Sequence, residues 1–304
     1  MEDKMENSMW LEERRKGIGG SDIAAILGMN PWKTAYRVYQ EKRKEVEDWQ
    51  GNEATDWGKR QEPIIRQWYS DTTGRPVRLP DKLIYHAKYP FMLASLDGFT
   101  DDKRIVEIKT ARSGKDWGEP GTNEIPDYYA LQVQHYMVVT GLEVADVPVS
   151  IAGGSPSLYE VPADPDLQKM IIEAEADFWQ RVVEGRPPAP QTYADAVQRF
   201  GKSAAIGAVV ASDGALTGVD ELRAVRDRLK ELETIEEDIK GRLIIFLGEV
   251  GDTLVGPDGK PLATYKMGKG ATRFDAKAFE KDNPELYKQY LRAGDPVRRF
   301  LLKG

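Results

Sequence analysis

The chain reads Ala94-Ser95-Leu96-Asp97-Gly98 and, a few residues later, Val106-Glu107-Ile108-Lys109-Thr110. Because side chains alternate between the two faces of a β-strand, Glu107 and Lys109 are expected to share one face of a strand over residues 104–110. Such a spacing alone is more often a turn followed by a solvated strand edge. The other residues of this strand are largely apolar, however, and this favours a strand anchored in a core.

Asp97 ends the preceding expected strand, over residues 91–96. If the two strands pair, two carboxylates and a lysine converge at one end of a sheet. Two carboxylates and the backbone carbonyl of Ile108 can bind a hard divalent cation. Such a cation polarises a phosphodiester and lowers the pKa of a bound water, which gives a nucleophile at neutral pH. Lys109 can orient that water or offset charge in the transition state.

Composition narrows the choice of metal. The 304 residues include no cysteine, which excludes disulfides, thiolate zinc sites, iron–sulfur clusters and cysteine nucleophiles. The two histidines, His86 and His135, are too few for a histidine-rich zinc centre. A metal held by this chain is therefore expected to be magnesium, calcium or manganese, bound by carboxylates and carbonyls.

The distribution of charge is uneven. The net charge is −7, but 11 basic and 5 acidic residues follow from Lys260 to the end, a local charge of +6. Affinity for nucleic acid depends on the local field, so the acidic total argues only against indiscriminate coating of DNA. No apolar run approaches the roughly 18 residues of a membrane span, and residues 1–15 lack the apolar core of a signal peptide. We therefore expect a cytoplasmic protein.

Helices and strands are expected to alternate before Gly185. Ser21 is expected to cap a short helix that ends near Gly28, and Thr34 to open a helix that reaches about Lys44. Further helices are expected over 52–70, 128–140 and 165–184, and strands over 83–87, 91–96, 104–110, 144–151 and 157–161. This order predicts a mixed α/β fold.

The segment Gly185-Arg186-Pro187-Pro188-Ala189-Pro190 predicts a boundary between a domain over 1–190 and a smaller, mostly helical region over 191–304. In that region apolar residues repeat at steps of three and four, with an interruption at Glu236: Leu222, Val225, Leu229, Leu232, Ile239, Leu243 and Phe246. This pattern favours a coiled-coil or helix-pair surface. A hairpin around Pro257-Asp258-Gly259, a helix over 276–291 and a strand-like tail over 297–302 complete the expectation.

Several motifs follow one another in the order of a known nuclease family. They are Gly17-Ile18-Gly19-Gly20-Ser21-Asp22, Trp57-Gly58, Glu62-Pro63, Leu93-Ala94-Ser95-Leu96-Asp97-Gly98, Glu107-Ile108-Lys109-Thr110-Ala111, Tyr128, Gln132-Val133-Gln134-His135-Tyr136, Phe178-Trp179 and Gly185-Arg186-Pro187-Pro188. With these residues the chain resembles the lambda-exonuclease or YqaJ-like viral recombinase family of the PD-(D/E)XK nuclease superfamily. Leu96 departs from the family, which often has proline there. The resemblance implies a restriction-endonuclease-like core, a mixed central sheet flanked by helices.

The resemblance also implies roles for the site residues. Asp97 and Glu107, with the carbonyl of Ile108, would be the main metal ligands, and Glu62 would assist on a second ion or through water. Lys109 would be the catalytic lysine, and Gln132 would position that lysine or the attacking water. The implied metal is magnesium, for which manganese is expected to substitute.

The activity implied is a 5′→3′ exonuclease that degrades one strand of linear double-stranded DNA and leaves 3′ tails for strand annealing. Arg15, Ser21 and Ser95 match positions that line the family's pocket for the terminal 5′-phosphate. Ser21 is equally suited to cap a helix, and Arg14 or Lys16 could take the place of Arg15.

Family members imply two kinds of partner, a single-strand annealing protein and further copies of the chain in a ring-shaped trimer around DNA. Two other functions stay open at this point. One is a structure-selective endonuclease built on the same core. The other is a catalytically silent protein that binds DNA ends, against which the intact set of Asp97, Glu107 and Lys109 argues.

Overall fold

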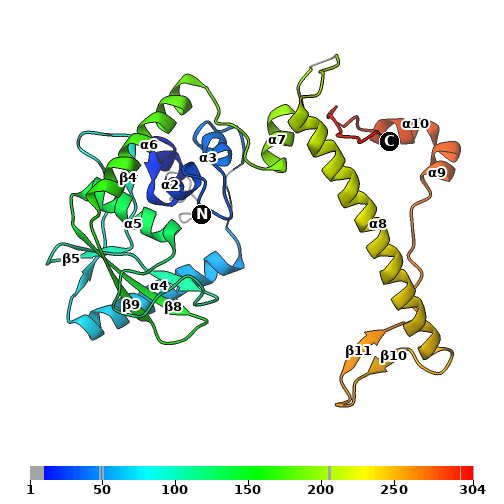
Figure 1. The fold of residues 1–304 in the computed structure, drawn as a ribbon, viewed down its shortest axis with the longest axis horizontal. Helices are drawn as coiled ribbons and strands as arrows, with labels where there is room; N and C mark the ends of the chain where they lie inside the picture. The colour runs from blue at the N-terminus through cyan, green and yellow to red at the C-terminus, as the bar shows by residue number, and fades with distance from the viewer. Residues whose placement is uncertain (1–9, 48, 50, 205–206, 295, 304) are drawn as a thin grey trace. The chain divides into compact units, whose positions relative to one another are not determined.

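The computed structural model describes residues 10–47, 49, 51–204, 207–294 and 296–303. It divides into two compact units, Met1–Arg199 and Phe200–Gly304 (Figure 1). The division falls after the expected boundary at residue 190, because the next residues are tied to the first unit. The backbone N–H of Ala35 donates to Gln191 (2.9 Å), and the Thr34 hydroxyl donates to Asp195 (3.0 Å).

The larger sheet of the first unit is mixed. It contains β2 (Val77–Arg78), β5 (Gly98–Thr100), β6 (Arg104–Val106), β7 (Lys109–Ala111), β8 (Val144–Ile151) and β9 (Ser157–Pro162). Strands β6 and β7 both pair in parallel with β8, whereas β9 pairs with β8 antiparallel. Antiparallel pairing joins β5 to β6 and β2 to β5. The predicted mixed α/β class is confirmed.

A second, smaller sheet corrects one expectation. Its strands β1 (Ile18–Gly19), β4 (Met92–Ala94) and β3 (Ile84–Tyr85) lie in the order β1-β4-β3. The strand before Asp97 therefore does not pair with the strand of Glu107, which was the condition for the convergence of their side chains. On the side of β6 away from β8, the neighbouring strand is β5, which has only three residues and is too short to show a periodic pattern. Asp97 lies between β4 and β5, where the chain passes from one sheet to the other.

Six helices of the first unit carry labels: α2 (Gly20–Ile26), α3 (Ala35–Lys42), α4 (Glu53–Thr73), α5 (Asp127–Thr140), α6 (Pro165–Glu184) and α7 (Tyr193–Phe200). Helices α5 and α6 pack on one face of the larger sheet, and α4 packs on the other. Ile105 belongs to the core cluster that contains α5 and α6 side chains, whereas Val106 and Ile108 pack with Ile65 and Tyr69 of α4. By alternation, Glu107 and Lys109 face α5, in the same direction as Ile105.

Helix ends follow from local chemistry. Thr34 and Asn52 cap α3 and α4 with their side chains, as predicted for Thr34. Helices α4, α5 and α6 end at glycines in the left-handed region, Gly74, Gly141 and Gly185. The predicted cap at Ser21 is wrong, because α2 begins at Gly20 with Gly19 as its cap.

The second unit contains α8 (Asp213–Leu247), the hairpin of β10 (Thr253–Val255) and β11 (Pro261–Thr264), and the short helices α9 (Ala276–Asp282) and α10 (Pro284–Tyr290). The predicted hairpin is confirmed. The single helix predicted over 276–291 is wrong, because Pro284 lacks an N–H and disfavours helical backbone at the residue before it. Among the described residues the tail over 297–302 forms no strand.

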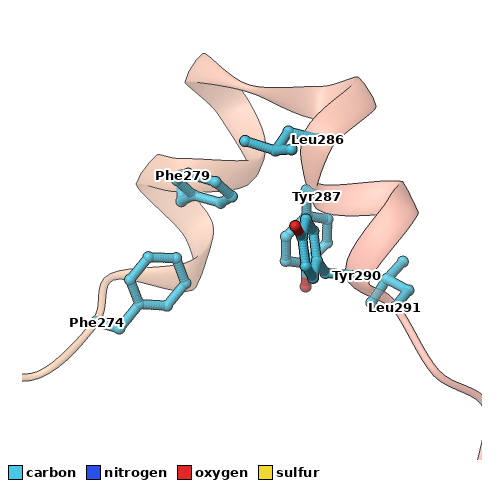
Figure 2. Close-up of a pocket in the computed structure, with 6 residues that line it drawn as sticks. All are labelled: Phe274, Phe279, Leu286, Tyr287, Tyr290 and Leu291. Atoms are coloured by element: carbon cyan, nitrogen blue, oxygen red, sulfur yellow. The ribbon is translucent and has the colours of Figure 1, made fainter.

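Helices α9 and α10 enclose an apolar pocket of about 470 Å³ (Figure 2). Its lining consists of Phe274, Phe279, Leu286, Tyr287, Tyr290 and Leu291. None of the helices that the structure describes is both long and apolar enough to cross a membrane.

Candidate active site

The backbone between β6 and β7 is hydrogen-bonded to a carboxylate. Val106 pairs with Asp146 and Lys109 with Val149, so β6 and β7 follow β8 in one unbroken register. The strand predicted over 104–110 is nevertheless divided at residues 107 and 108. Here the N–H of Ile108 donates to Oδ2 of Asp97 (2.8 Å). This bond holds the carboxylate of Asp97 next to the backbone between Glu107 and Lys109.

Three polar side chains meet where the sheet faces α5. Nζ of Lys109 donates to Oε1 of Glu107 (2.7 Å) and to Oε1 of Gln132 (3.0 Å). Nε2 of Gln132 donates to the same oxygen of Glu107 (2.7 Å) and contacts the hydroxyl of Tyr136 (3.0 Å). The ammonium of Lys109 also lies 4.6 Å from the ring centre of Tyr129. Lys109 is thus fixed by a carboxylate, an amide and an aromatic face.

The second carboxylate oxygen of Glu107, Oε2, accepts no hydrogen bond from the described residues. It is buried, although buried polar atoms are nearly always paired. Burial, and then repulsion from Asp97, raise the pKa of Glu107 to about 8. A cation beside Oε2 would remove both penalties at once. The orphaned oxygen therefore fits a metal ligand.

The other acids of the site are also perturbed. Burial raises the pKa of Asp97 against the attraction of Lys109, and burial followed by repulsion from Asp97 raises the pKa of Glu62, on α4. Although burial would lower the pKa of Lys109, the charges of Glu107 and Asp97 raise it above its usual value. Lys109 is consequently a cation at neutral pH.

The donor set suits magnesium. In the described part of the chain, no three His, Cys, Asp or Glu side chains gather closely enough to form a metal site by themselves. Magnesium usually binds one or two carboxylates and keeps several waters. Asp97, Glu107 and the carbonyl of Ile108 would hold such an ion, and Glu62 is close enough to Asp97 and Glu107 for their charges to repel one another.

A pocket of about 200 Å³ joins these residues to a second group of polar side chains. Its lining consists of Trp10, Arg14, Gly19, Gly20, Ser21, Leu93, Ser95, Asp97, Glu107, Gln132 and Tyr136. Nη2 of Arg14 donates to the hydroxyl of Ser21 (2.8 Å). The predicted hydroxyls of Ser21 and Ser95 thus share one cavity with the metal-ligand candidates.

The arginine in this pocket is Arg14 and not the predicted Arg15. Residues 10–15 are helical, and neighbours on a helix point about 100° apart, so only one of the two can face the pocket. Arg15 forms an ion pair with Glu12 (2.5 Å). The run Arg14-Arg15-Lys16 alone does not reveal which residue faces inward.

Tyr136 belongs to one of the motifs quoted above, but the sequence assigned it no role in the site. It lies four residues after Gln132 on α5 and therefore on the same helix face, a spacing that could have identified it. Gly20 matters for a related reason. A Cβ atom at this position would lie 2.6 Å from the Tyr136 ring, so glycine allows α2 to approach α5 at the pocket.

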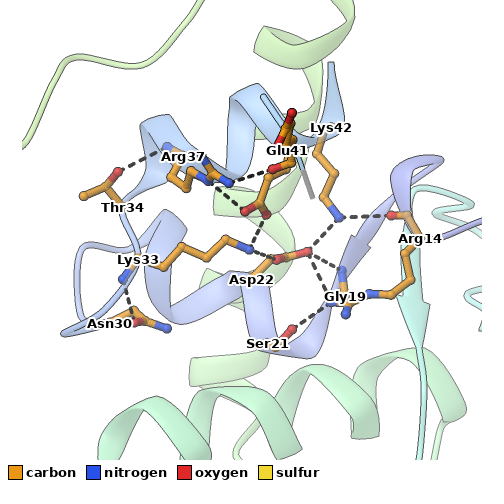
Figure 3. A network of polar contacts seen from close by, with 11 residues as sticks. Arg14, Gly19, Ser21, Asp22, Asn30, Lys33, Thr34, Arg37, Glu41 and Lys42 are labelled. Carbon is orange, nitrogen blue, oxygen red and sulfur yellow. Dashed lines mark hydrogen bonds and ion pairs between the residues drawn. The ribbon is translucent and has the colours of Figure 1, made fainter. Parts of the chain in front are cut away.

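A buried ionic network centred on Asp22 lies next to the pocket and includes Arg14, which lines it. Asp22, on α2, lies between three cations (Figure 3): Nζ of Lys42 at 2.7 Å, Nζ of Lys33 at 3.1 Å and Nη2 of Arg14 at 3.9 Å. Burial by itself would raise the pKa of Asp22, but these charges hold it well below its usual value. The network fixes the position of Arg14 relative to Ser21.

Comparison with known proteins identifies the family to which the chain is similar. A family model described as the YqaJ-like viral recombinase domain matches residues 9–143, a range that includes every candidate site residue named above. The uncharacterized protein YqaJ of Bacillus subtilis (strain 168) is 30% identical over 99% of this chain and 95% of its own length.

Among solved structures, the alkaline exonuclease of Laribacter hongkongensis is similar in fold. Its TM-score is 0.50 with 20% identity, and the match covers 59% of this chain and 94% of that protein. The expected nuclease-type mixed α/β core is thereby confirmed as a fold, whereas activity has to be argued from the site. The chain belongs to the YqaJ-like viral recombinase family.

Proposed function

We propose that the protein is a metal-dependent 5′→3′ exonuclease that degrades one strand of linear double-stranded DNA. The observation that carries this proposal is the single pocket that contains both Asp97 and Glu107 and the group Arg14, Ser21 and Ser95. The first pair suits a cation that activates water, and the second suits a phosphate. A site that holds a terminal phosphate beside a hydrolytic centre selects DNA ends.

The chain's own residues divide the work of hydrolysis. Magnesium, for which manganese would substitute, would be held by Asp97, Glu107 and the carbonyl of Ile108, and would supply Lewis-acid stabilisation of the phosphodiester and activation of water. Lys109, fixed by Glu107 and Gln132, offsets the negative charge that develops on the phosphoryl oxygens. Gln132 orients Lys109 or the attacking water, and Glu62 accepts a hydrogen bond from water or assists a second ion.

Arg14 is expected to set the preference for 5′-phosphorylated ends. Arg14→Gln should lower kcat/KM on a 5′-phosphorylated duplex by roughly tenfold to a hundredfold, the usual loss for a hydrogen bond to a charged group, and change digestion of a 5′-hydroxyl duplex little. Arg15→Gln is the matched control and should keep the preference. Initial rates on the two duplexes measure the effect. Equal losses on both substrates would remove Arg14 from phosphate recognition.

Polarity is tested with end labels. A duplex labelled at either its 5′ or its 3′ ends is digested with magnesium, and products are followed over time. Early release of the 5′ label as a mononucleotide, with the 3′ label retained in long single strands, is the expected result. Early release of the 3′ label would contradict the proposed direction.

The biological setting belongs to the same proposal. The 3′ tails left by such an enzyme are the substrate of a single-strand annealing protein, which is the proposed partner in phage-type recombination in the cytoplasm of a bacterial host. A ring of three copies around the DNA would keep the enzyme on its substrate between cuts.

A further inference from the structure

Helix α8 carries an apolar stripe that nothing in the described structure covers. The stripe recurs at steps of three and four along 35 residues, or about 52 Å of helix. From Val225 to Leu243 its members keep between 40% and 55% of their surface exposed: Val225, Leu229, Leu232, Ile239 and Leu243. A long helix in water depends on burial of such a face for its stability. Packing against a second helix would bury this stripe and stabilise α8.

We propose that two copies of the chain pair through α8 in antiparallel orientation, centred between Lys230 and Glu231. Opposed residues then have numbers that add up to 461, and apolar meets apolar near the centre. Leu229 lies opposite Leu232 of the second copy, and Leu222 lies opposite Ile239. In heptad terms the stripe residues alternate between a and d positions, and each of these layers pairs an a residue of one copy with a d residue of the other. This is the packing of an antiparallel coiled coil.

The ends of the stripe fit the same register. Leu243 meets Gly218 of the second copy, and Phe246 meets Ala215. Each layer thus combines a large side chain with a small one, which fills space evenly. In a parallel pair the two glycines would face each other, and so would the two phenylalanines.

Glu236, which interrupts the stripe, selects the orientation. In a parallel pair the two Glu236 carboxylates would meet in one layer, where like charges repel and are partly desolvated. In the antiparallel register Glu236 lies opposite Val225 of the second copy. Its carboxylate also keeps its own partner, Nζ of Lys240, at 2.6 Å on the same helix.

The charge along the helix agrees with this choice. Residues 223–230 contain four basic residues and one acidic residue, whereas residues 231–238 contain five acidic residues and no basic one. Antiparallel pairing places the basic segment of each copy beside the acidic segment of the other. Residues that flank the stripe meet two positions away from the directly opposed ones, which brings Arg226 near Glu233 of the second copy and Glu221 near Arg242. Parallel pairing would place like segments side by side.

Cysteine cross-linking tests both the pairing and its orientation, because the chain has no cysteine of its own. Leu222→Cys, Ile239→Cys and the double variant are made in the full chain and mildly oxidised. Within one helix these positions are about 25 Å apart, too far for a disulfide. The double variant should form covalent dimers on a non-reducing gel, and the single variants should not. Dimers of the single variants would show parallel pairing, and no cross-link in any variant would show no pairing; either result overturns the proposal.

A mass measurement gives a second readout that does not depend on nuclease activity. Leu229→Asp introduces charge into both central layers and should halve the molar mass measured by light scattering, whether the parent is a simple dimer or two three-copy rings joined through α8. Ala224→Asp adds the same charge on the outer side of α8 and should leave the mass unchanged. An unchanged mass for Leu229→Asp, with retained helical circular dichroism, would overturn the proposal even if the exonuclease assignment holds.

Discussion

Lys109→Met is expected to reduce DNA cleavage by roughly 10²–10³-fold in kcat, the usual loss when one preorganised charge at a reacting centre is removed. Nζ of Lys109 lies 2.7 Å from Glu107 and 3.0 Å from Gln132, so its position is fixed before substrate binds. Methionine keeps the aliphatic stem and removes the charge alone. In its proposed role Lys109 acts on the transition state, so KM should change little.

The control for this experiment is Lys115→Met, which removes an exposed lysine shortly after the same strand. It should retain nearly full activity. Single-turnover rates on a linear duplex separate the chemical step from product release. Full activity of Lys109→Met would contradict the role of this lysine, and equal losses in both variants would point to a general effect of charge on DNA binding.

Asp22→Asn is expected to destabilise the nuclease unit by about 3–5 kcal/mol, the usual cost when one partner of a buried ion pair is removed. The reason is that Lys42 would stay buried without its counter-charge 2.7 Å away. Asp166→Asn is the matched control, because Asp166 lies in the first turn of α6 but is exposed. Urea unfolding of the two variants and the parent measures the difference. A loss below 1 kcal/mol for Asp22→Asn would contradict the account.

The same network gives the stability a dependence on pH. Because the pKa of Asp22 is depressed in the folded state, its contribution is complete above its ordinary value of 3.8 and is lost as the pH falls through the lower folded-state value. The stability gap between the parent and Asp22→Asn should therefore be constant near pH 7 and shrink below about pH 4. A gap that widens on acidification would contradict this sign.

The sequence alone was informative where local chemistry decides the structure. The apolar run around Glu107 and Lys109 predicted a buried strand, and alternation predicted their common face. Thr34 marked the start of α3, and the limits of β8 and α6 coincide with those predicted. These features depend on residues close together in the chain, so pattern and propensity suffice.

The features that sequence could not supply depend on distant residues. Asp97 bonds to the N–H of Ile108 and so divides a strand that the pattern predicts as continuous. The choice of Arg14 over Arg15 depends on how one helix rotates against the pocket. The division between α9 and α10 was readable in principle, because Pro284 marks it, but the apolar pattern across it suggested one helix.

Digestion of a linear 5′-phosphorylated duplex beside a covalently closed circle, with magnesium or with excess chelator, tests the central claim most directly. The proposed function predicts loss of the linear DNA only, and only with magnesium, because in that proposal Asp97 and Glu107 bind the cation and the group of Arg14, Ser21 and Ser95 binds a terminal phosphate. Cleavage of the circle would contradict the exonuclease and indicate an endonuclease. Persistence of both DNAs with magnesium would contradict catalysis and leave a protein that binds DNA ends.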